Sequence, residues 1–129
     1  MSDGRPSGRS DSAGRPRRWW PPALWAAALL TATSWPSPHV PEVRGGDKVV
    51  HAALYGGLAW LIARAEPRLV RRATSLALVL VALSAFAAVD EWHQLFIPGR
   101  SADVADWLAD TVGAALALLA AAVSRRQPA

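Results

Sequence analysis

The residues best suited to chemistry in this sequence lie in three short polar clusters, each at the edge of a long apolar segment. The first cluster contains Asp47, Lys48, His51 and Tyr55. Positions 47, 51 and 55 share one face of a helix because they are four residues apart, and Lys48 lies beside that face. A histidine between an acid and a tyrosine suits proton transfer or ligand binding. The alternatives are that Asp47 only caps the helix and that His51 is a buried residue bonded to a backbone carbonyl.

The second cluster ends one apolar segment and continues into the loop after it. Asp90 and Gln94 share a helix face, whereas Pro98 and Gly99 form a turn signal that ends the helix. Arg100 follows that turn, and its guanidinium group can hold a carboxylate or a phosphate through two hydrogen bonds. The alternative is that Arg100 pairs with a local acid and fixes the loop. The full cluster is Asp90, Glu91, Gln94, Pro98, Gly99 and Arg100.

The third cluster places Asp103, Asp106 and Asp110 on one face of a helix, because the spacings are three and four residues. Asp103 can cap this helix, but Asp110 lies about 10 Å further along the axis. A carboxylate in lipid costs a few kcal/mol, so Asp110 must face the bundle interior, paired with a cation or protonated. Gly113 lies near the same face and permits a close helix approach. Candidate cations are Lys48, His51 and Arg100.

Four uncharged runs separate these clusters, and the chain is 52% hydrophobic. A soluble helical bundle would need a polar stripe along each helix, and these segments lack one. Segments of about 20 apolar residues match the thickness of a bilayer. The sequence therefore predicts an all-α polytopic membrane protein, a bundle of four transmembrane helices. The predicted helices span about 19–35, 46–65, 71–94 and 102–124, within a membrane domain at 19–125.

The first apolar segment has a second interpretation. Arg15, Arg17 and Arg18 precede an apolar stretch at 24–30 and small residues at 31–34, which is also the pattern of a cleaved signal peptide. Three tryptophans in this segment, at 19, 25 and 35, instead favour a retained span anchored at the interface. Residues 1–18 are predicted to be a disordered basic tail, and residues 126–129 a short C-terminal tail.

Charge distribution predicts the orientation in the membrane. Eleven of the 14 basic residues lie before the first helix, between the second and third, or at the C-terminus. These segments share one side of a four-helix protein, so the positive-inside rule places both termini in the cytoplasm. The three polar clusters then lie at the extracytoplasmic side. Nucleic acid is not an expected partner, because the arginines flank apolar segments and do not line one soluble face.

The order of the polar motifs resembles the VanZ-like membrane proteins, over about two thirds of the chain from Trp35 to beyond Gly113. The motifs are Asp-Lys-x-x-His-x-x-x-Tyr, Asp-Glu-x-x-Gln-x-x-x-Pro-Gly-Arg and Asp-x-x-Asp-x-x-x-Asn/Asp-x-x-Gly. Here they run from Asp47 to Tyr55, from Asp90 to Arg100 and from Asp103 to Gly113. The family often has Asn where Asp110 stands, which implies that a hydrogen-bonding group is sufficient there. The family takes its name from a component of teicoplanin resistance clusters, so the resemblance implies a site more than a reaction.

Four functions are compatible with these residues. The first is binding of an anionic envelope component, a lipid head group or cell-wall precursor, through Arg100 and Lys48. The second is acid–base or metal-dependent hydrolysis or transfer on envelope lipids, using His51 and the acids. The third is ion translocation, and the fourth a purely structural network. Membrane lipids are expected partners. No cofactor or metal is predicted, because the chain has no cysteine and no zinc-type histidine spacing. The sequence also has no Ser or Cys nucleophile motif, which favours a protein that is not an enzyme.

Overall fold

A computed structural model describes residues 18–36 and 45–126, and all regular structure in these residues is helical, which confirms the all-α prediction. The predicted N-terminal and C-terminal tails lie outside the described residues except for Arg18 and Arg126. The elements are α1 (Trp20–Thr33), α2 (Gly46–Ala65), a 3₁₀ helix η3 (Pro67–Val70), α3 (Ala73–Gln94) and α4 (Val104–Ser124). The observed bounds of α2 coincide with the predicted ones, and the other helices are two to three residues shorter.

Local chemistry explains these shorter helices. Helix α4 begins at Val104 because Asp103 adopts an extended backbone and its side chain caps the helix, accepting from Ala105 N–H at 2.8 Å. Helix α3 begins at Ala73 and not at residue 71, because η3 occupies the connection after α2. Helix α1 ends at Thr33, shortly before Pro36, which disfavours helical backbone at the residue before it.

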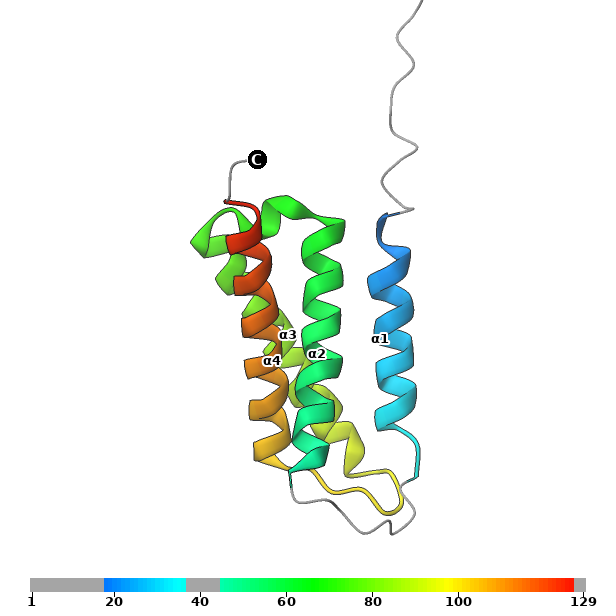
Figure 1. The fold of residues 1–129 in the computed structure, drawn as a ribbon. Helices are drawn as coiled ribbons and strands as arrows, with labels where there is room; N and C mark the ends of the chain where they lie inside the picture. Colours follow the sequence, from blue (N-terminus) through cyan, green and yellow to red (C-terminus); the bar gives the residue numbers. More distant parts are fainter. Residues whose placement is uncertain (1–17, 37–44, 127–129) are drawn as a thin grey trace, which may run out of the picture.

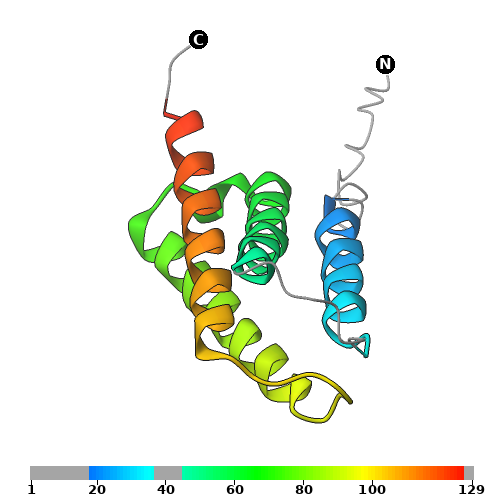
Figure 2. The same cartoon turned by 60° about the horizontal axis from the view of Figure 1, so that its bottom comes forward.

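The helices form a bundle in which α2 lies between α1 and α4 (Figure 1). Helix α3 crosses this row obliquely, and the turned view shows its end approaching the end of α1 (Figure 2). The start of α1, the connection from α2 to α3 and the end of α4 lie at one end of the bundle. The start of α2, the end of α3 and the start of α4, which carry the polar clusters, therefore meet at the opposite end.

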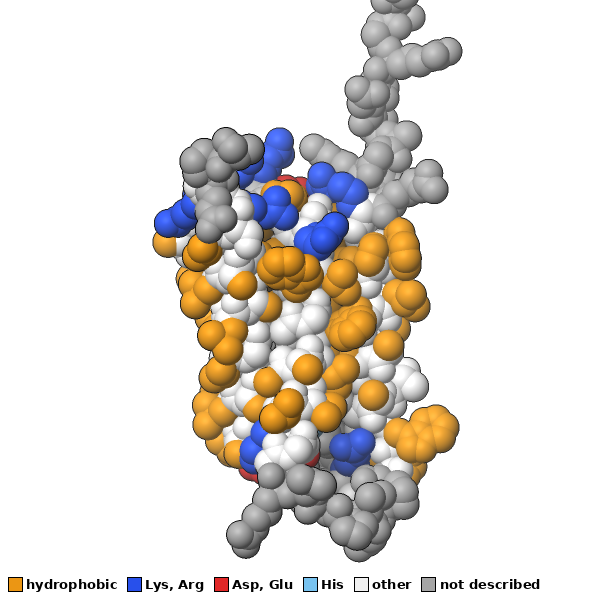
Figure 3. Space-filling model, viewed as in Figure 1, with side chains coloured by type: hydrophobic (Ala, Val, Ile, Leu, Met, Phe, Trp, Pro, Cys, Tyr) orange, Lys and Arg blue, Asp and Glu red, His pale blue; other side chains and the backbone are white. Residues whose placement is uncertain are grey.

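Two of the described helices, α3 and α4, are long and apolar enough to cross a membrane. Helix α1 has only 14 residues, and α2 contains Asp47, Lys48 and His51 in its first turns. Exposed apolar side chains, such as those of Leu78 and Leu116, follow the outer surface of the bundle. Lys and Arg side chains gather at its two ends (Figure 3). This distribution is that of a membrane protein. Two of the four predicted spans, α3 and α4, have the length and composition of a span, and the bundle of four spans stays a prediction.

Small residues let α2 and α4 approach closely. Gly113 of α4 lies against the backbone of Ala52, and a Cβ atom on Gly113 would collide with the Ala52 carbonyl oxygen. A Cβ on Gly56 would stand 3.2 Å from the Gly113 oxygen. The structure thus places Gly113 where its predicted packing role requires it. Alanines continue this packing toward the other end of the bundle, with Ala59, Ala63 and Ala114 completely buried.

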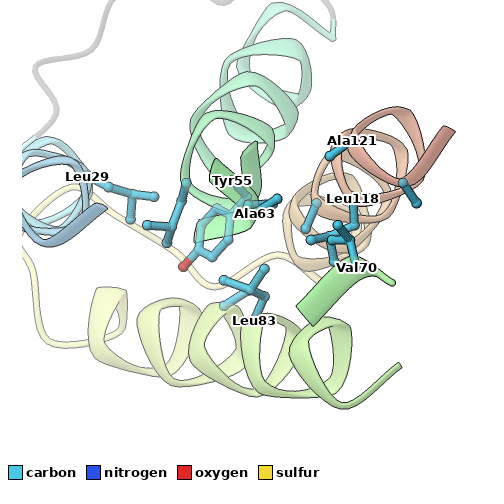
Figure 4. Packing of buried hydrophobic residues seen from close by; sticks show 12 residues of the cluster. Leu29, Tyr55, Ala63, Val70, Leu83, Leu118 and Ala121 are labelled. Atoms are coloured by element: carbon cyan, nitrogen blue, oxygen red, sulfur yellow. The ribbon is translucent and has the colours of Figure 1, made fainter. Parts of the chain in front are cut away.

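The apolar core joins all four helices. Tyr55 extends from α2 between Leu29 of α1 and Leu83 of α3 (Figure 4). Helix α1 is held further by Trp25, whose indole Nε1–H donates to the Leu54 carbonyl of α2 at 2.8 Å. These contacts cover faces of α2 and α3 with α1, and the retention of the first helix stays a prediction.

The Gly113→Ala variant is expected to lower the free energy of unfolding by about 1–3 kcal/mol or more, because its new methyl group must displace the backbone of α2. The sign of this change in stability is informative, because alanine stabilises a helix by about 1 kcal/mol relative to glycine where nothing obstructs its methyl group. Denaturant unfolding of the purified protein in detergent measures the change. The control is Ala120→Leu, which enlarges an exposed position of the same helix. Equal stability of the two variants would contradict the close approach described here.

Candidate functional site

Seven polar or charged side chains are buried among the described residues, and six of them belong to the predicted clusters. They come from the ends of α2, α3 and α4 that meet at one end of the bundle, and one comes from α1. Tyr55 joins them through its hydroxyl group. The buried polar residues are Thr33, His51, Asp90, Glu91, Gln94, Asp106 and Asp110. The structure therefore brings together groups that are up to 77 positions apart in the sequence.

Lys48 is a partly exposed cation at the edge of the site. Its ammonium group lies 2.9 Å from Asp106, 3.1 Å from Asp103 and 3.3 Å from Asp47. Asp103 caps α4 and Asp106 lies in its first turn, so Lys48 ties the start of α2 to the start of α4. Three carboxylates already neutralise this one cation, which leaves Lys48 little capacity for a further anion. Asp47 is exposed, and among the described residues its side chain contacts only Lys48.

His51 lies deeper, one turn further along α2. Its Nδ1 atom is 3.0 Å from Asp110 Oδ1 and 3.9 Å from Glu91 Oε1, while Nε2 is 4.0 Å from Asp106 Oδ2. The imidazole thus lies among three carboxylates from α3 and α4. The alternative that His51 is satisfied by a backbone carbonyl is wrong, because Asp110 is its partner. Asp110 has no exposed side-chain surface, and its Oδ2 atom has no hydrogen-bond partner among the described residues.

Asp90 forms a second centre, between α1, α2 and α3. The Thr33 hydroxyl donates to its Oδ1 atom at 2.8 Å, and the Tyr55 hydroxyl donates to Oδ2 at 3.3 Å. The sequence motifs did not identify Thr33, which entered only as part of the small-residue stretch at 31–34. A threonine within an apolar segment was the available signal, since a buried hydroxyl needs a partner, but Thr31 in the same segment gives the same signal.

Glu91 and Gln94 connect the end of α3 to the start of α4. Glu91 Oε2 accepts from the Asp103 N–H at 2.9 Å, and Gln94 donates to Glu91 Oε1 at 3.4 Å. Asp103 lies before α4 and caps it. Hydrogen bonds from the Ala105 N–H and from Lys48 hold the pKa of Asp103 below its ordinary value. Asp103 is therefore ionised at neutral pH, and its negative charge faces the Lys48 ammonium group.

Arg100 has a different role from the ones predicted. Its Nε and Nη2 atoms donate to the backbone carbonyls of Trp35 at 3.2 Å and Ala32 at 3.1 Å. It therefore caps the end of α1, and within residues 18–36 and 45–126 it forms no ion pair with an acid. The turn before it positions this side chain: Arg100 N–H donates to Ile97 O at 3.1 Å, and Gly99 has φ 78°. Pro98 and Gly99 at the two central positions give the pattern of a type II turn.

The site carries more negative than positive charge. Asp90, Glu91, Asp106 and Asp110 are buried carboxyl groups. Lys48 contacts only Asp106 among them, and Arg100 contacts none. Because buried carboxylates are stable only when they are paired or protonated, this arrangement favours a cation or protons over an additional anion. One potential ligand atom from each of His51, Glu91 and Asp110 also lies within 4.8 Å of the other two, which is close enough to share a metal ion.

An apolar groove of about 310 Å³ runs between the end of α3 and the start of α4. Its walls are mostly aromatic and aliphatic, and Glu91 and Asp103 of the polar site form part of them. The groove thus places a surface suited to an acyl or prenyl chain directly beside the buried carboxylates. The lining residues are Ala88, Glu91, Trp92, Leu95, Ala102, Asp103, Val104 and Trp107.

Two apolar helices of spanning length, with a buried polar site at their ends, indicate a helical membrane protein. The chain belongs to the VanZ/LLP1 family, whose model matches residues 11–125. This match confirms the family resemblance inferred from the order of the motifs. Comparisons with curated proteins and with solved structures give no match.

Arg100→Ala is expected to loosen the end of α1, because two carbonyl groups lose their donor. Bonds to a charged but partly exposed donor contribute about 1 kcal/mol, so stability should fall by about that amount. The chain has no cysteine, and a single Ser34→Cys background can therefore report on α1. A water-soluble maleimide should label it faster in Arg100→Ala than in the control Arg126→Ala, at the other end of the bundle. If labelling of Arg100→Ala is unchanged but the variant no longer binds a ligand at the polar site, Arg100 contacts that ligand directly.

Proposed function

We propose that this protein is a VanZ-family integral membrane protein that binds an anionic lipid of the cell envelope. The apolar groove between α3 and α4 carries this proposal, because it opens beside a buried polar site. The lipid chain lies in the groove against Trp92 and Trp107, and the head group lies near Glu91 and Asp103. The family's link to teicoplanin resistance makes a lipid-linked cell-wall precursor one candidate among such lipids.

The orientation of the site follows from charge. The end of the bundle opposite the polar site carries the arginines of the α2–α3 connection, Arg68, Arg71 and Arg72, together with Arg125. Under the positive-inside rule this end faces the cytoplasm. We therefore place both termini in the cytoplasm, in a multi-pass protein of the cell membrane, and the polar site at the extracytoplasmic side.

Direct recognition of an anion by Lys48 and Arg100 has less support than the sequence suggested. Lys48 is surrounded by Asp47, Asp103 and Asp106, and Arg100 donates to two carbonyl groups. An anionic head group at this site therefore has to share a cation with the buried carboxylates. The proposed binding is thus governed by the fit of the lipid chain and by a shared cation, with Lys48 orienting the acids.

Filling the groove tests this proposal. Ala88→Trp places a large side chain in the groove, whereas Ala85→Trp places the same side chain on an exposed position one turn earlier on α3. Native mass spectrometry of the detergent-purified protein should show a polyprenyl phosphate or phosphatidylglycerol bound to the wild type and to Ala85→Trp. Ala88→Trp should bind at least about tenfold more weakly, a loss of about 1.4 kcal/mol. Equal binding by both variants, or equal binding of phosphatidylcholine, would contradict the proposal.

The His51–Asp110 pair favours a second candidate, acid–base hydrolysis or transfer on an envelope lipid. If Nδ1 donates to Asp110 at 3.0 Å, Nε2 is left to accept a proton from water or substrate. This chemistry predicts turnover of a polyprenyl pyrophosphate by the reconstituted protein, reduced by about a hundredfold or more in His51→Gln. Phosphate release measures it. Wild-type protein without turnover, while it still binds the lipid, would leave binding as the function.

A further inference from the structure

We propose that His51, Glu91 and Asp110 form a binding site for a divalent metal ion. One residue comes from each of α2, α3 and α4, and their ligand atoms lie within 4.8 Å of one another. The side chains are 8%, 7% and 0% exposed. Metal binding is measured without lipid, so this inference stands apart from the proposed lipid binding.

The distances suit one shared ion. Two ligand atoms about 2.1 Å from a tetrahedral metal are about 3.4 Å apart. His51 Nδ1 lies 3.0 Å from Asp110 Oδ1 and 3.9 Å from Glu91 Oε1, on either side of that value. Small rotations of these side chains therefore bring the three atoms around a single ion. The proton on His51 Nδ1 leaves when the ion binds, because a metal ligand must offer its lone pair.

The unpartnered oxygen of Asp110 is an independent sign of a missing ligand. Asp110 is completely buried, and within residues 18–36 and 45–126 no donor reaches its Oδ2 atom. An orphaned acceptor at such depth costs about 1–3 kcal/mol, and more when it carries charge. The other oxygen, Oδ1, contacts His51. An ion that binds this carboxyl group through both of its oxygens would therefore also satisfy Oδ2.

Charge balance supports the same site. Asp90 has two hydroxyl donors, and Asp106 has Lys48. Glu91 accepts hydrogen bonds from two neutral donors, the Asp103 N–H and Gln94. Among the described residues, His51 is the one basic group within 4 Å of the Glu91 and Asp110 carboxyl groups. A divalent ion at this point compensates both carboxylates at once.

The donor set indicates which metals fit. One imidazole nitrogen and two carboxylate oxygens suit Zn²⁺ or Mn²⁺ better than Mg²⁺ or Ca²⁺, which prefer oxygen ligands alone. Three protein ligands also leave coordination positions for water or another oxygen donor. If the proposed lipid binding holds, a phosphate oxygen of the head group can take one of these positions, which lie beside Glu91 at the edge of the groove.

The test is a titration of chelator-stripped, detergent-purified protein with MnCl₂ or ZnCl₂ alone, followed by calorimetry and, for Mn²⁺, by electron paramagnetic resonance. The wild type should bind one ion per chain and unfold at a higher temperature when the metal is present. Glu91→Gln and Asp110→Asn should each bind more than about tenfold more weakly. The matched control is Asp47→Asn, which removes an exposed carboxylate that contacts only Lys48 among the described residues, and its affinity should not change.

Each outcome decides the inference. Absence of one-to-one binding by folded wild-type protein would overturn it, as would an equal loss of affinity in Asp47→Asn and Asp110→Asn. The metal-free unfolding temperature of each variant shows whether the site lost a ligand or the chain lost its fold. A wild-type protein that binds no metal ion but still binds the lipid, with binding weakened by Ala88→Trp, would overturn the metal site and leave the groove as the lipid site. Metal binding by a protein that binds no lipid would contradict the proposed function and leave the metal site intact.

Discussion

The contact between α2 and α4 at Gly113 sets the geometry of everything at the polar end of the molecule. Without a Cβ atom on Gly113, the backbone of Ala52 can lie directly against α4. Ala52 immediately follows His51, so the same approach brings His51 to 3.0 Å from Asp110 and Lys48 to 2.9 Å from Asp106. The van der Waals packing of two small residues thus positions the charged groups. An unpaired charged group in an apolar medium has a large desolvation cost, so the packing must bring the groups into contact.

The charged groups in turn hold the ends of the helices. Glu91 accepts a hydrogen bond from the Asp103 N–H, which fixes the start of α4 to the end of α3. Asp90 accepts a hydrogen bond from the Thr33 hydroxyl, and Arg100 donates to the carbonyl groups at the end of α1. These interactions are those expected of the purely structural alternative, in which polar residues join helices. They account for Asp90, Arg100 and Lys48. In the part of the chain that the structure describes, they leave Asp110 Oδ2 without a partner and the buried carboxyl groups with fewer cations than negative charges.

This imbalance gives the site its functional character. A network that only joined helices would be expected to satisfy its buried acceptors, since each unmet one costs stability. The excess of carboxylates lies beside a groove whose walls are apolar, so the same end of the bundle offers a cation site and a surface for a lipid chain. Ion translocation has less support, because the buried core between the polar site and the arginines at the other end consists of Ala, Leu, Tyr and Val side chains.

Periodicity and motif order alone were sufficient to predict the all-α class, the extent of α2, the family and six of the seven buried polar residues. These features are local, because apolar runs and spacings of three and four residues determine helices and their faces. The role of Arg100, the contribution of Thr33 and the grouping of His51, Glu91 and Asp110 depended on tertiary structure. Arg100 meets α1 only because the Pro98–Gly99 turn and the oblique path of α3 carry it there. The three possible metal ligands are 40 and 19 positions apart, and only the packing of three helices brings them within 4.8 Å.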